Sequence, residues 1–513
     1  MTPASTLPLS HPSSGAGTAR RFADVLPYLA VVVLTACLLR WLPRPLTSDV
    51  AGQLWIARAL RGGARLYVDI HEVNPPLWFW LAVPVDWLAE RLRLSPADVL
   101  IAACGATALL SVAAADRLLC HLPPARRRAL LVYAGTILLV MPLRDTAQRE
   151  FLALAGAISY ALLIAARRDG RAAPPLLAAL VGLGAGVGFA LKHYFLGVPL
   201  LLELWLIASL RSGWRPLRAE TLALAAAGAA YAAAVLIVTP DYLATIVPQL
   251  ALAYGVAMPG GPMVQPAQWI WLLLLILVAT QARRLPALAT ALLLAAAGFA
   301  AAWLIQNRGW PYHAIPATGA LALAAAALLV EAWERTGEVV RRVAPAALLL
   351  PVALALAPTH APVTPANDIA PALAGLKPGD PVALISTEGF TAWPAAVDRG
   401  FRWSSRYGQY WMLGAIDARA HDARVAAFGR EVARRTAHDY RCLPPLRIVV
   451  TRPGRADPRA GAAGDPLRWF LGEPAFARVF AHYRPWRRHG MFDTYRLARP
   501  VAAPDPATCR RAV

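Results

Sequence analysis

The chain of 513 residues is 58% hydrophobic and only 16% charged, which is more apolar than a water-soluble core requires. Its formal net charge is +21, but the arginines are spread over short loops between apolar runs rather than gathered in one domain. This distribution argues against a nucleic-acid partner and predicts a polytopic α-helical membrane protein, in contact with lipid, whose basic loops face the cytoplasm.

Apolar windows of about 20 residues predict about eleven transmembrane helices. The stretch Met1–Thr18 lacks the early positive charge of a cleavable signal peptide, so we expect residues 1–22 to form a cytoplasmic tail that is followed by a retained first span. The predicted spans are Ala23–Leu42, Ala97–Leu119, Ala129–Pro142, Phe151–Ala166, Pro174–Leu191, Phe195–Leu210, Ala219–Val238, Trp269–Thr280, Leu285–Ile305, Ala314–Val330 and Ala344–Ala357. Together they predict a membrane domain over residues 23–357.

The segment Pro75–Glu90 decides the topology, because counting it as a span would reverse the orientation of every later helix. It is short against the ~20 residues of a span and contains Pro84 and Asp86. If it is instead an amphipathic helix in the membrane interface, the arginine clusters of the later loops all fall on the cytoplasmic side. We therefore predict that the N-terminus lies in the cytoplasm and the C-terminus on the outer side of the membrane.

On this topology the outward loops collect the unusual polar residues. Residues 49–74, 144–150, 192–194 and 306–313 all lie at the outer face. A further outward stretch, Pro240–Gln268, contains the moderately apolar piece Tyr242–Tyr254, for which a second interfacial helix and a lid are both open. The glycines Gly182, Gly184, Gly186 and Gly188 alternate inside a span, where small residues indicate close helix packing.

After Ala357 the sequence becomes polar and rich in arginine, which predicts a separate domain on the outer side of the membrane over residues 358–513. Strand patterns at Pro381–Ser386 and Leu446–Thr451, with a helical pattern at Asp417–Arg435, predict a small α/β domain. Its basic balance favours a position over anionic lipid or an anionic acceptor. Cys442 and Cys509 both lie in this domain, and the sequence allows either a disulfide or two free thiols.

A motif of single residues follows the first predicted span. It consists of Asp49, Trp55, Ala57, Gly62, Tyr67, Asp69, Glu72, Asn74, Pro75, Pro76 and Leu77. With this motif the first 200 residues or so, together with residues 309–313, resemble the GT-C glycosyltransferases, and more narrowly the group that contains the lipid A aminoarabinose transferase, the protein O-mannosyltransferases and the rhizobial lipopolysaccharide galacturonosyltransferases. The resemblance implies transfer of a sugar, with inversion, from a polyprenyl-phosphate donor to an envelope glycan, a lipid or a protein at the periplasmic face of a bacterial inner membrane.

Such a transfer requires a base for the proton of the acceptor and cations for the departing phosphate. We expect Asp49 to be the base, although Ser48-Asp49 also fits a solvated helix cap. The resemblance assigns a catalytic role to Glu72 as well. Family members often have Glu-Lys-Pro-Pro where this chain has Glu72-Val73-Asn74-Pro75-Pro76, so the acidic residue is displaced and the lysine is missing.

Lys192 is the stronger candidate among the cations, because only it and Lys377 are lysines among the 51 basic residues. The compact ammonium of a lysine can bind a phosphate as a point charge. The plainer alternative is that Lys192 is an anchor at the end of a span, with its charged group extended to the membrane surface. The full set predicted for the donor phosphate is Lys192, His193, Arg144, Arg149 and Arg308. The set predicted to bind the substrate is Tyr67, Asp69, Asn74, Asp145, Glu150, Tyr312 and His313, of which the last two equally fit an interfacial anchor.

Asp145 and Glu150 alternate with arginines, which favours ion pairs over a divalent metal ion. We expect no metal and no cofactor, since neither zinc-ligand spacing nor a nucleotide-binding motif occurs in the sequence. Two other classes of function remain open: a flippase or polymer ligase for lipid-linked sugars, and a membrane anchor for a periplasmic binding domain. Neither specifically needs Asp49, and the anchor does not need charged clusters on one face.

Overall fold

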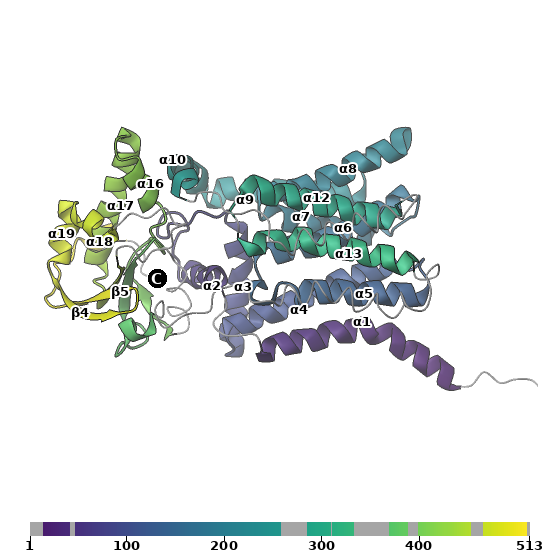
Figure 1. Ribbon diagram of the computed structural model, residues 1–513, viewed down its shortest axis with the longest axis horizontal. Helices are drawn as coiled ribbons and strands as arrows, with labels where there is room; N and C mark the ends of the chain where they lie inside the picture. Colours follow the sequence, from purple (N-terminus) through teal and green to yellow (C-terminus); the bar gives the residue numbers. More distant parts are fainter. Residues whose placement is uncertain are drawn as a thin grey trace, which may run out of the picture.

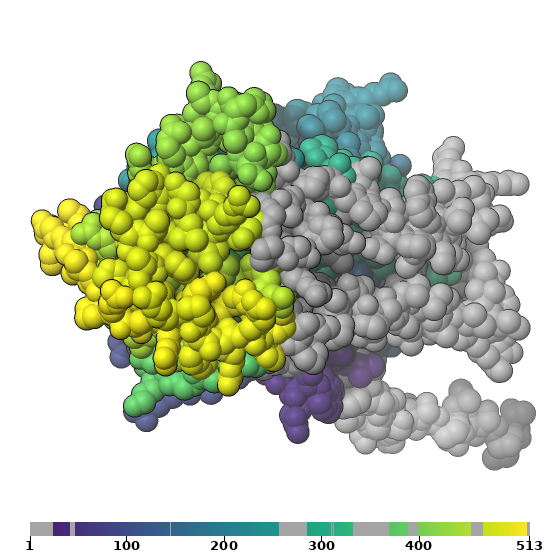
Figure 2. Space-filling view, turned by 60° about the vertical axis from the view of Figure 1, so that its left-hand side comes forward, coloured from purple at the N-terminus to yellow at the C-terminus, as the bar shows by residue number. Residues whose placement is uncertain are grey.

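The computed structural model describes residues 14–41, 47–257, 285–308, 310–332, 369–387, 399–452 and 465–509. Long helices lie side by side in a bundle, and a small sheet domain formed by the C-terminal residues covers one end of that bundle (Figure 1). Figure 2 shows the C-terminal residues, in yellow and light green, gathered at this end.

Seven of the described helices are long and apolar enough to cross a membrane, and α7 is a shorter apolar helix. The chain is therefore a multi-pass membrane protein. The helices of the bundle are α1 (Ser14–Trp41), α4 (Pro96–Leu118), α5 (Pro124–Leu139), α6 (Arg149–Arg168), α7 (Pro175–Ala190), α8 (Gly197–Leu210), α9 (Ala219–Val238), α12 (Ala287–Gln306) and α13 (Ile315–Ala332). They match nine of the predicted spans, while Trp269–Thr280 and Ala344–Ala357 lie outside the described residues.

Helix α6 is the centre of the bundle, because nearly all of its residues are buried and it packs against α4, α7, α12 and α13. The alternating glycines of α7 allow two close approaches. A Cβ at Gly182 would lie 2.2 Å from the backbone oxygen of Glu220 on α9, and one at Gly188 would lie 2.9 Å from the backbone oxygen of Leu152 on α6. The prediction of close packing is thus confirmed for Gly182 and Gly186, which meet α9, and for Gly188, which meets α6, whereas nothing lies within 4 Å of a Cβ at Gly184.

Two helices connect the bundle to its capped end. Helix α2 (Ser48–Arg61) is followed by α3 (Leu77–Leu92), which runs across the ends of the long helices (Figure 1). The buried carboxylate of Asp86 on α3 accepts hydrogen bonds from Arg58 at 3.3 Å and Arg61 at 2.6 Å on α2. The segment predicted as an interfacial helix therefore forms a helix, and its one buried acid is neutralised by the neighbouring helix.

The C-terminal domain contains a five-stranded mixed sheet in the order β2-β1-β3-β5-β4. Strand β1 is parallel to β2 and β3, whereas β5 is antiparallel to β3 and β4. The strands are β1 (Pro381–Ile385), β2 (Arg402–Trp403), β3 (Arg447–Thr451), β4 (Tyr483–His489) and β5 (Phe492–Leu497), and the helices are α16 (Leu413–Ala418), α17 (Ala423–Cys442), α18 (Pro466–Leu471) and α19 (Pro474–Phe480). Both predicted strands are present, and the predicted helical stretch is divided between α16 and α17.

The segment predicted as an interfacial helix or lid is helical and joins the two parts of the molecule. It consists of a π-helical turn, η4 (Tyr242–Ile246), and helix α10 (Val247–Ala257). Ala253 is fully buried in the core of the C-terminal domain, and Arg419 of that domain donates a hydrogen bond to the backbone oxygen of Leu252 at 2.9 Å. The remaining short turns are η1 (Leu143–Asp145), η2 (His193–Leu196), η3 (Arg211–Gly213), η5 (Pro311–Ala314), η6 (Ala370–Leu373) and η8 (Pro506–Thr508).

Candidate active site

A polar cavity of about 950 Å³, including its opening to solvent, lies where the helix bundle meets the C-terminal domain. Segments far apart in the sequence contribute to its wall: helix α2, the loop before α3, the start of α6, α10, η5 and a loop of the C-terminal domain. The lining residues are Ser48, Asp49, Gly52, Gln53, Trp55, Ile56, Ile70, His71, Glu72, Val73, Asn74, Trp78, Phe79, Arg149, Tyr254, Trp310, Tyr312, Gly408, Gln409 and Trp411.

Asp49 is half-buried and lies in the first turn of α2, where the helix dipole favours a negative charge. The residue at the N-cap is Thr47, so Asp49 does not occupy the capping position itself. One oxygen of its carboxylate accepts a long hydrogen bond of 3.5 Å from the side-chain amide of Gln148. The carboxylate is therefore held at the cavity by weak contacts and remains accessible to a ligand there.

Glu72 shapes the loop before α3. Its Oε1 accepts hydrogen bonds of 2.8 Å from the backbone N–H groups of Val73 and Asn74 and from the side-chain amide of Asn74. Tyr67 donates a bond of 2.7 Å to the backbone oxygen of Asn74 from the other side. Burial raises the pKa of Glu72 despite these bonds. Both residues thus fix the position of Asn74, and Glu72 also lines the cavity.

Arg149 is the cation of the cavity wall. Its guanidinium lies 4.7 Å above the ring of Trp78 and donates a hydrogen bond to the side-chain oxygen of Asn74. Only 3% of the residue is exposed, and its Nε has no hydrogen-bond partner among the residues that the structure describes. A buried guanidinium with a donor to spare is suited to bind an anion.

A second cavity, which is apolar, lies next to the first, between α3, α4, α6 and α7. It has a volume of about 1850 Å³ and shares Gln53 and Trp78 with the polar cavity. The two shared side chains are fixed, because Gln53 donates to the backbone oxygen of Trp78 at 2.8 Å and Trp78 donates to that of Ala147 at 3.3 Å. Most of its wall consists of apolar side chains, among them Leu81, Leu100, Leu110, Leu152, Leu177, Leu180 and Val187. We call this second cavity the apolar groove.

Lys192 lies behind the polar cavity rather than in its wall. Its ammonium is 7% exposed and donates to Glu150 at 2.5 Å and to Gln306 at 3.2 Å, and it lies 3.1 Å from Nε2 of His313. The carboxylate of Glu150 already compensates the charge of Lys192 in this structure, and the role of Lys192 as a phosphate ligand stays a prediction. Glu150 and His313 belong to this buried cluster and likewise do not line the cavity.

The other predicted site residues divide into two groups. Tyr312, Asn74 and Arg149 line the polar cavity as expected. Asp69 is buried and bonded to the backbone N–H of Arg65 at 2.8 Å, and the guanidinium of Arg308 lies 4.5 Å above the ring of Tyr254. Neither of these two lines the polar cavity, and nor do Tyr67, Asp145 and the exposed His193. The side chain of Arg144 lies outside the described part of the chain.

The sequence analysis did not identify the cavity-lining residues of α10 and of the C-terminal domain. Tyr254 lies on α10, and Gly408, Gln409 and Trp411 lie in the C-terminal domain. Trp310 could have been found, because residues 309–313 belong to the part of the sequence that resembles the GT-C family. No local pattern in the sequence marks residues 408–411. Their role depends on tertiary contacts between segments distant in the sequence.

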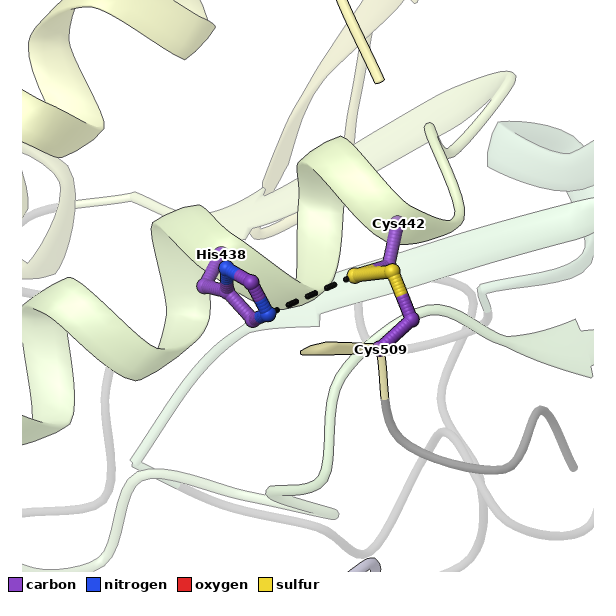
Figure 3. Close-up of side chains that lie close together, drawn as sticks. All are labelled: His438, Cys442 and Cys509. Atoms are coloured by element: carbon purple, nitrogen blue, oxygen red, sulfur yellow. Dashed lines mark hydrogen bonds between the residues drawn. A yellow bond between two sulfur atoms is a disulfide. The ribbon is translucent and has the colours of Figure 1, made fainter. Parts of the chain in front are cut away.

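One further group of potential metal ligands occurs in the C-terminal domain. His438, Cys442 and Cys509 lie close together, as Figure 3 shows. Cys442 and Cys509 form a disulfide, and Nε2 of His438 lies 3.5 Å from the sulfur of Cys442 and 3.0 Å from the backbone oxygen of Thr508. Because metal binding requires thiolates, the disulfide excludes these sulfurs as ligands.

No family model matches this sequence, and no curated protein matches it. Two solved structures of ArnT from Cupriavidus metallidurans are similar to this structure over 96% of this chain and 100% of theirs. The apo form has 15% sequence identity and a TM-score of 0.57, and the form bound to undecaprenyl phosphate has 12% identity and a TM-score of 0.52. The chain therefore has the GT-C fold that its N-terminal motif predicted, with a small sheet domain at its C-terminus.

Proposed function

We propose that this protein is a membrane glycosyltransferase that transfers a sugar from a polyprenyl-phosphate donor to an acceptor outside the cytoplasm. The observation that carries the proposal is the junction at Gln53 and Trp78, two residues that line both a polar cavity with a carboxylate and a buried arginine and a neighbouring apolar groove. A lipid-linked sugar has the same division, with a long apolar chain on one side of a phosphate and a polar sugar on the other. ArnT bound to undecaprenyl phosphate supports this chemistry for the fold.

In this proposal Arg149 binds the phosphate of the donor. Its guanidinium stands at the junction, between Asn74 of the polar cavity and Trp78, which borders both cavities. A planar guanidinium forms paired, charge-assisted hydrogen bonds with phosphate oxygens, and these bonds strengthen as the leaving phosphate gains charge. Arg149 is one of the five residues that the sequence predicted for this role, together with Lys192, His193, Arg144 and Arg308.

Asp49 is the proposed base. The hydroxyl oxygen of the acceptor attacks the anomeric carbon of the sugar, and the bond from that carbon to the phosphate oxygen breaks. The phosphate leaves with the electron pair, and Asp49 takes the hydroxyl proton, so the configuration at the anomeric carbon is inverted. Glu72 would hold Asn74 and, through Asn74, the orientation of Arg149.

The proposal also includes the orientation of the protein in the membrane. Helix α6 begins at the polar cavity with Arg149 and ends with Arg167 and Arg168, ~30 Å away for a helix of this length. The positive-inside rule then favours a cytoplasmic N-terminus and a periplasmic C-terminal domain, residues 358–513, at a bacterial inner membrane.

The test is release of free polyprenyl phosphate by the purified protein from a panel of polyprenyl-phosphate sugars in the presence of membrane extract. We expect release from at least one donor, and a higher KM for a donor with a chain too short to fill the apolar groove. Transport of a lipid-linked sugar without its cleavage would instead identify a flippase. Equal KM values for short and long chains would contradict the role of the groove.

A further inference from the structure

The C-terminal domain contributes part of the wall of the polar cavity. Gly408, Gln409 and Trp411 follow β2 in the sequence and line the same cavity as Asp49 and Arg149. Arg149 is the proposed ligand of the donor phosphate, and the sugar is bonded directly to that phosphate. The sugar would therefore lie next to Arg149, inside this cavity. The residues of the C-terminal domain therefore face the space that the sugar would occupy.

The loop that carries these residues is fixed to both parts of the molecule. Arg406 forms an ion pair of 2.8 Å with the buried Asp439 on α17, and it donates to the backbone oxygen of Val68 at 3.3 Å. The backbone N–H of His71 in turn donates to the oxygen of Arg406 at 2.8 Å, and the ring of His71 packs on Tyr407 at 4.8 Å. The loop is thus part of a rigid wall, which can select a ligand by its shape.

Aromatic rings give this wall an apolar surface. Trp411 is buried and meets the ring of Tyr254 edge to face at 5.6 Å, and Trp310 stacks on Tyr312 at 5.9 Å between ring centres. All four residues line the cavity. A sugar ring has apolar C–H faces and a polar rim, so a cavity that combines aromatic rings with a few polar groups fits such a ligand.

The polar side chains of the cavity wall include the amide of Gln409 and the imidazole of His71. Within the described part of the chain, Nε2 of His71 has no hydrogen-bond partner although it is buried. Burial lowers the pKa of His71 to about 3, so the imidazole is neutral at pH 7 and Nε2 can donate or accept one hydrogen bond. A hydroxyl group of a ligand would satisfy this atom.

We propose that Gln409 and Trp411 of the C-terminal domain, together with His71, bind the sugar of the donor and determine which sugar is accepted. The inference rests on the proposed function, and it assigns to the C-terminal domain a direct part in the active site. The alternative, that these residues bind the acceptor, is an outcome of the test.

The experiment compares the wild type with Gln409→Ala and Trp411→Phe, and with Trp469→Phe as a matched control. Trp469 also packs in the C-terminal domain, against Phe470, but does not line the cavity. For each variant, the donor KM and kcat are measured on the active donor and on an analogue lacking one sugar hydroxyl, and the affinity for bare polyprenyl phosphate is measured separately.

We expect Gln409→Ala and Trp411→Phe to raise the donor KM by about 10-fold and to reduce the preference for the complete sugar. Their affinity for bare polyprenyl phosphate should equal that of the wild type, because that ligand has no sugar. Arg149→Gln should weaken it, and Trp469→Phe should change none of these values. An unchanged donor KM together with a raised acceptor KM would overturn the inference. Absence of donor cleavage by the wild type would instead overturn the proposed function.

Discussion

The buried cluster around Lys192 lies next to residues that line the polar cavity. Lys192 bonds to Glu150 at the start of α6 and lies beside His313 of η5. Their neighbours in sequence, Arg149 and Tyr312, both line the polar cavity. Lys192 thus connects the start of α6 with η5, and both of these segments contribute to the cavity wall.

Removing one partner of this ion pair should destabilise the protein strongly. Lys192→Met leaves the Glu150 carboxylate buried without its counter-charge, which costs about 3–5 kcal/mol, whereas Lys192→Met combined with Glu150→Met should recover most of that loss. Chemical unfolding in detergent measures both. If Lys192 instead bound the donor phosphate, the double variant would be as deficient in polyprenyl-phosphate binding as the single one.

The same lysine should contribute to the pH dependence of stability. Burial lowers the pKa of Lys192 from 10.5 to about 8, so between these values the unfolded chain holds a proton that the folded chain has released. The free energy of unfolding should therefore rise as the pH increases from about 8 to 10.5. Comparing unfolding curves of the wild type and Lys192→Met over this range isolates the contribution, and identical slopes would refute it.

At the scale of elements, the sequence was most informative where a pattern of apolar residues extends over the whole helix or strand. The spans within the described residues, the helix α3 and both predicted strands could be read from local pattern alone, because burial in lipid or in a sheet imposes that pattern. The glycines of α7 could be recognised as packing residues, but not their partners. Which glycine faces α9 and which faces α6 depends on the rotation of the helix within the bundle.

The packing of α7 against α9 makes Gly182 sensitive to any side chain. A methyl group there would lie 2.2 Å from the backbone oxygen of Glu220, an acid that Arg167 and Arg218 also bind. We expect Gly182→Ala to lower stability by about 1–3 kcal/mol through overpacking.

The matched control is Gly228→Ala on α9, because nothing lies within 4 Å of the position of its new methyl group. This variant should be as stable as the wild type or slightly more so, since alanine favours a helix over glycine. Thermal unfolding of both variants in one detergent provides the comparison, and equal stability of the two would contradict the close contact between α7 and α9.

At the scale of the whole molecule, the polar cavity is formed by segments from both ends of the chain. Asp49, Asn74 and Arg149 could be named from the sequence, because they belong to a recognisable N-terminal motif or to the next outward loop. Gln409 and Trp411 could not, since only the docking of the C-terminal domain brings them there. The exclusion of Lys192 from the cavity was equally out of reach, because a compensating carboxylate is visible only in three dimensions.

The disulfide between Cys442 and Cys509 should stabilise the C-terminal domain. It joins the end of α17 to the C-terminal segment over a separation of 67 residues, and closing a loop of this size in the unfolded chain contributes typically about 2–4 kcal/mol. Cys442→Ser with Cys509→Ser should therefore lower the unfolding temperature. Cys120→Ser, which alters an exposed free cysteine, should leave it unchanged. A double variant as stable as the wild type under non-reducing conditions would show that the disulfide adds nothing.

The most direct test of the account is single-turnover cleavage of the donor by wild-type protein, Asp49→Asn and Asp241→Asn. Asp241 is a half-buried carboxylate near the same end of the bundle that does not line the polar cavity. Asp49→Asn keeps the size of the side chain but cannot take a proton, so we predict a rate about 100-fold or more below the wild type, with unchanged affinity for polyprenyl phosphate. Asp241→Asn should react at the wild-type rate. Cleavage by Asp49→Asn at the full rate would contradict the central claim that the Asp49 carboxylate is the base of a glycosyl transfer.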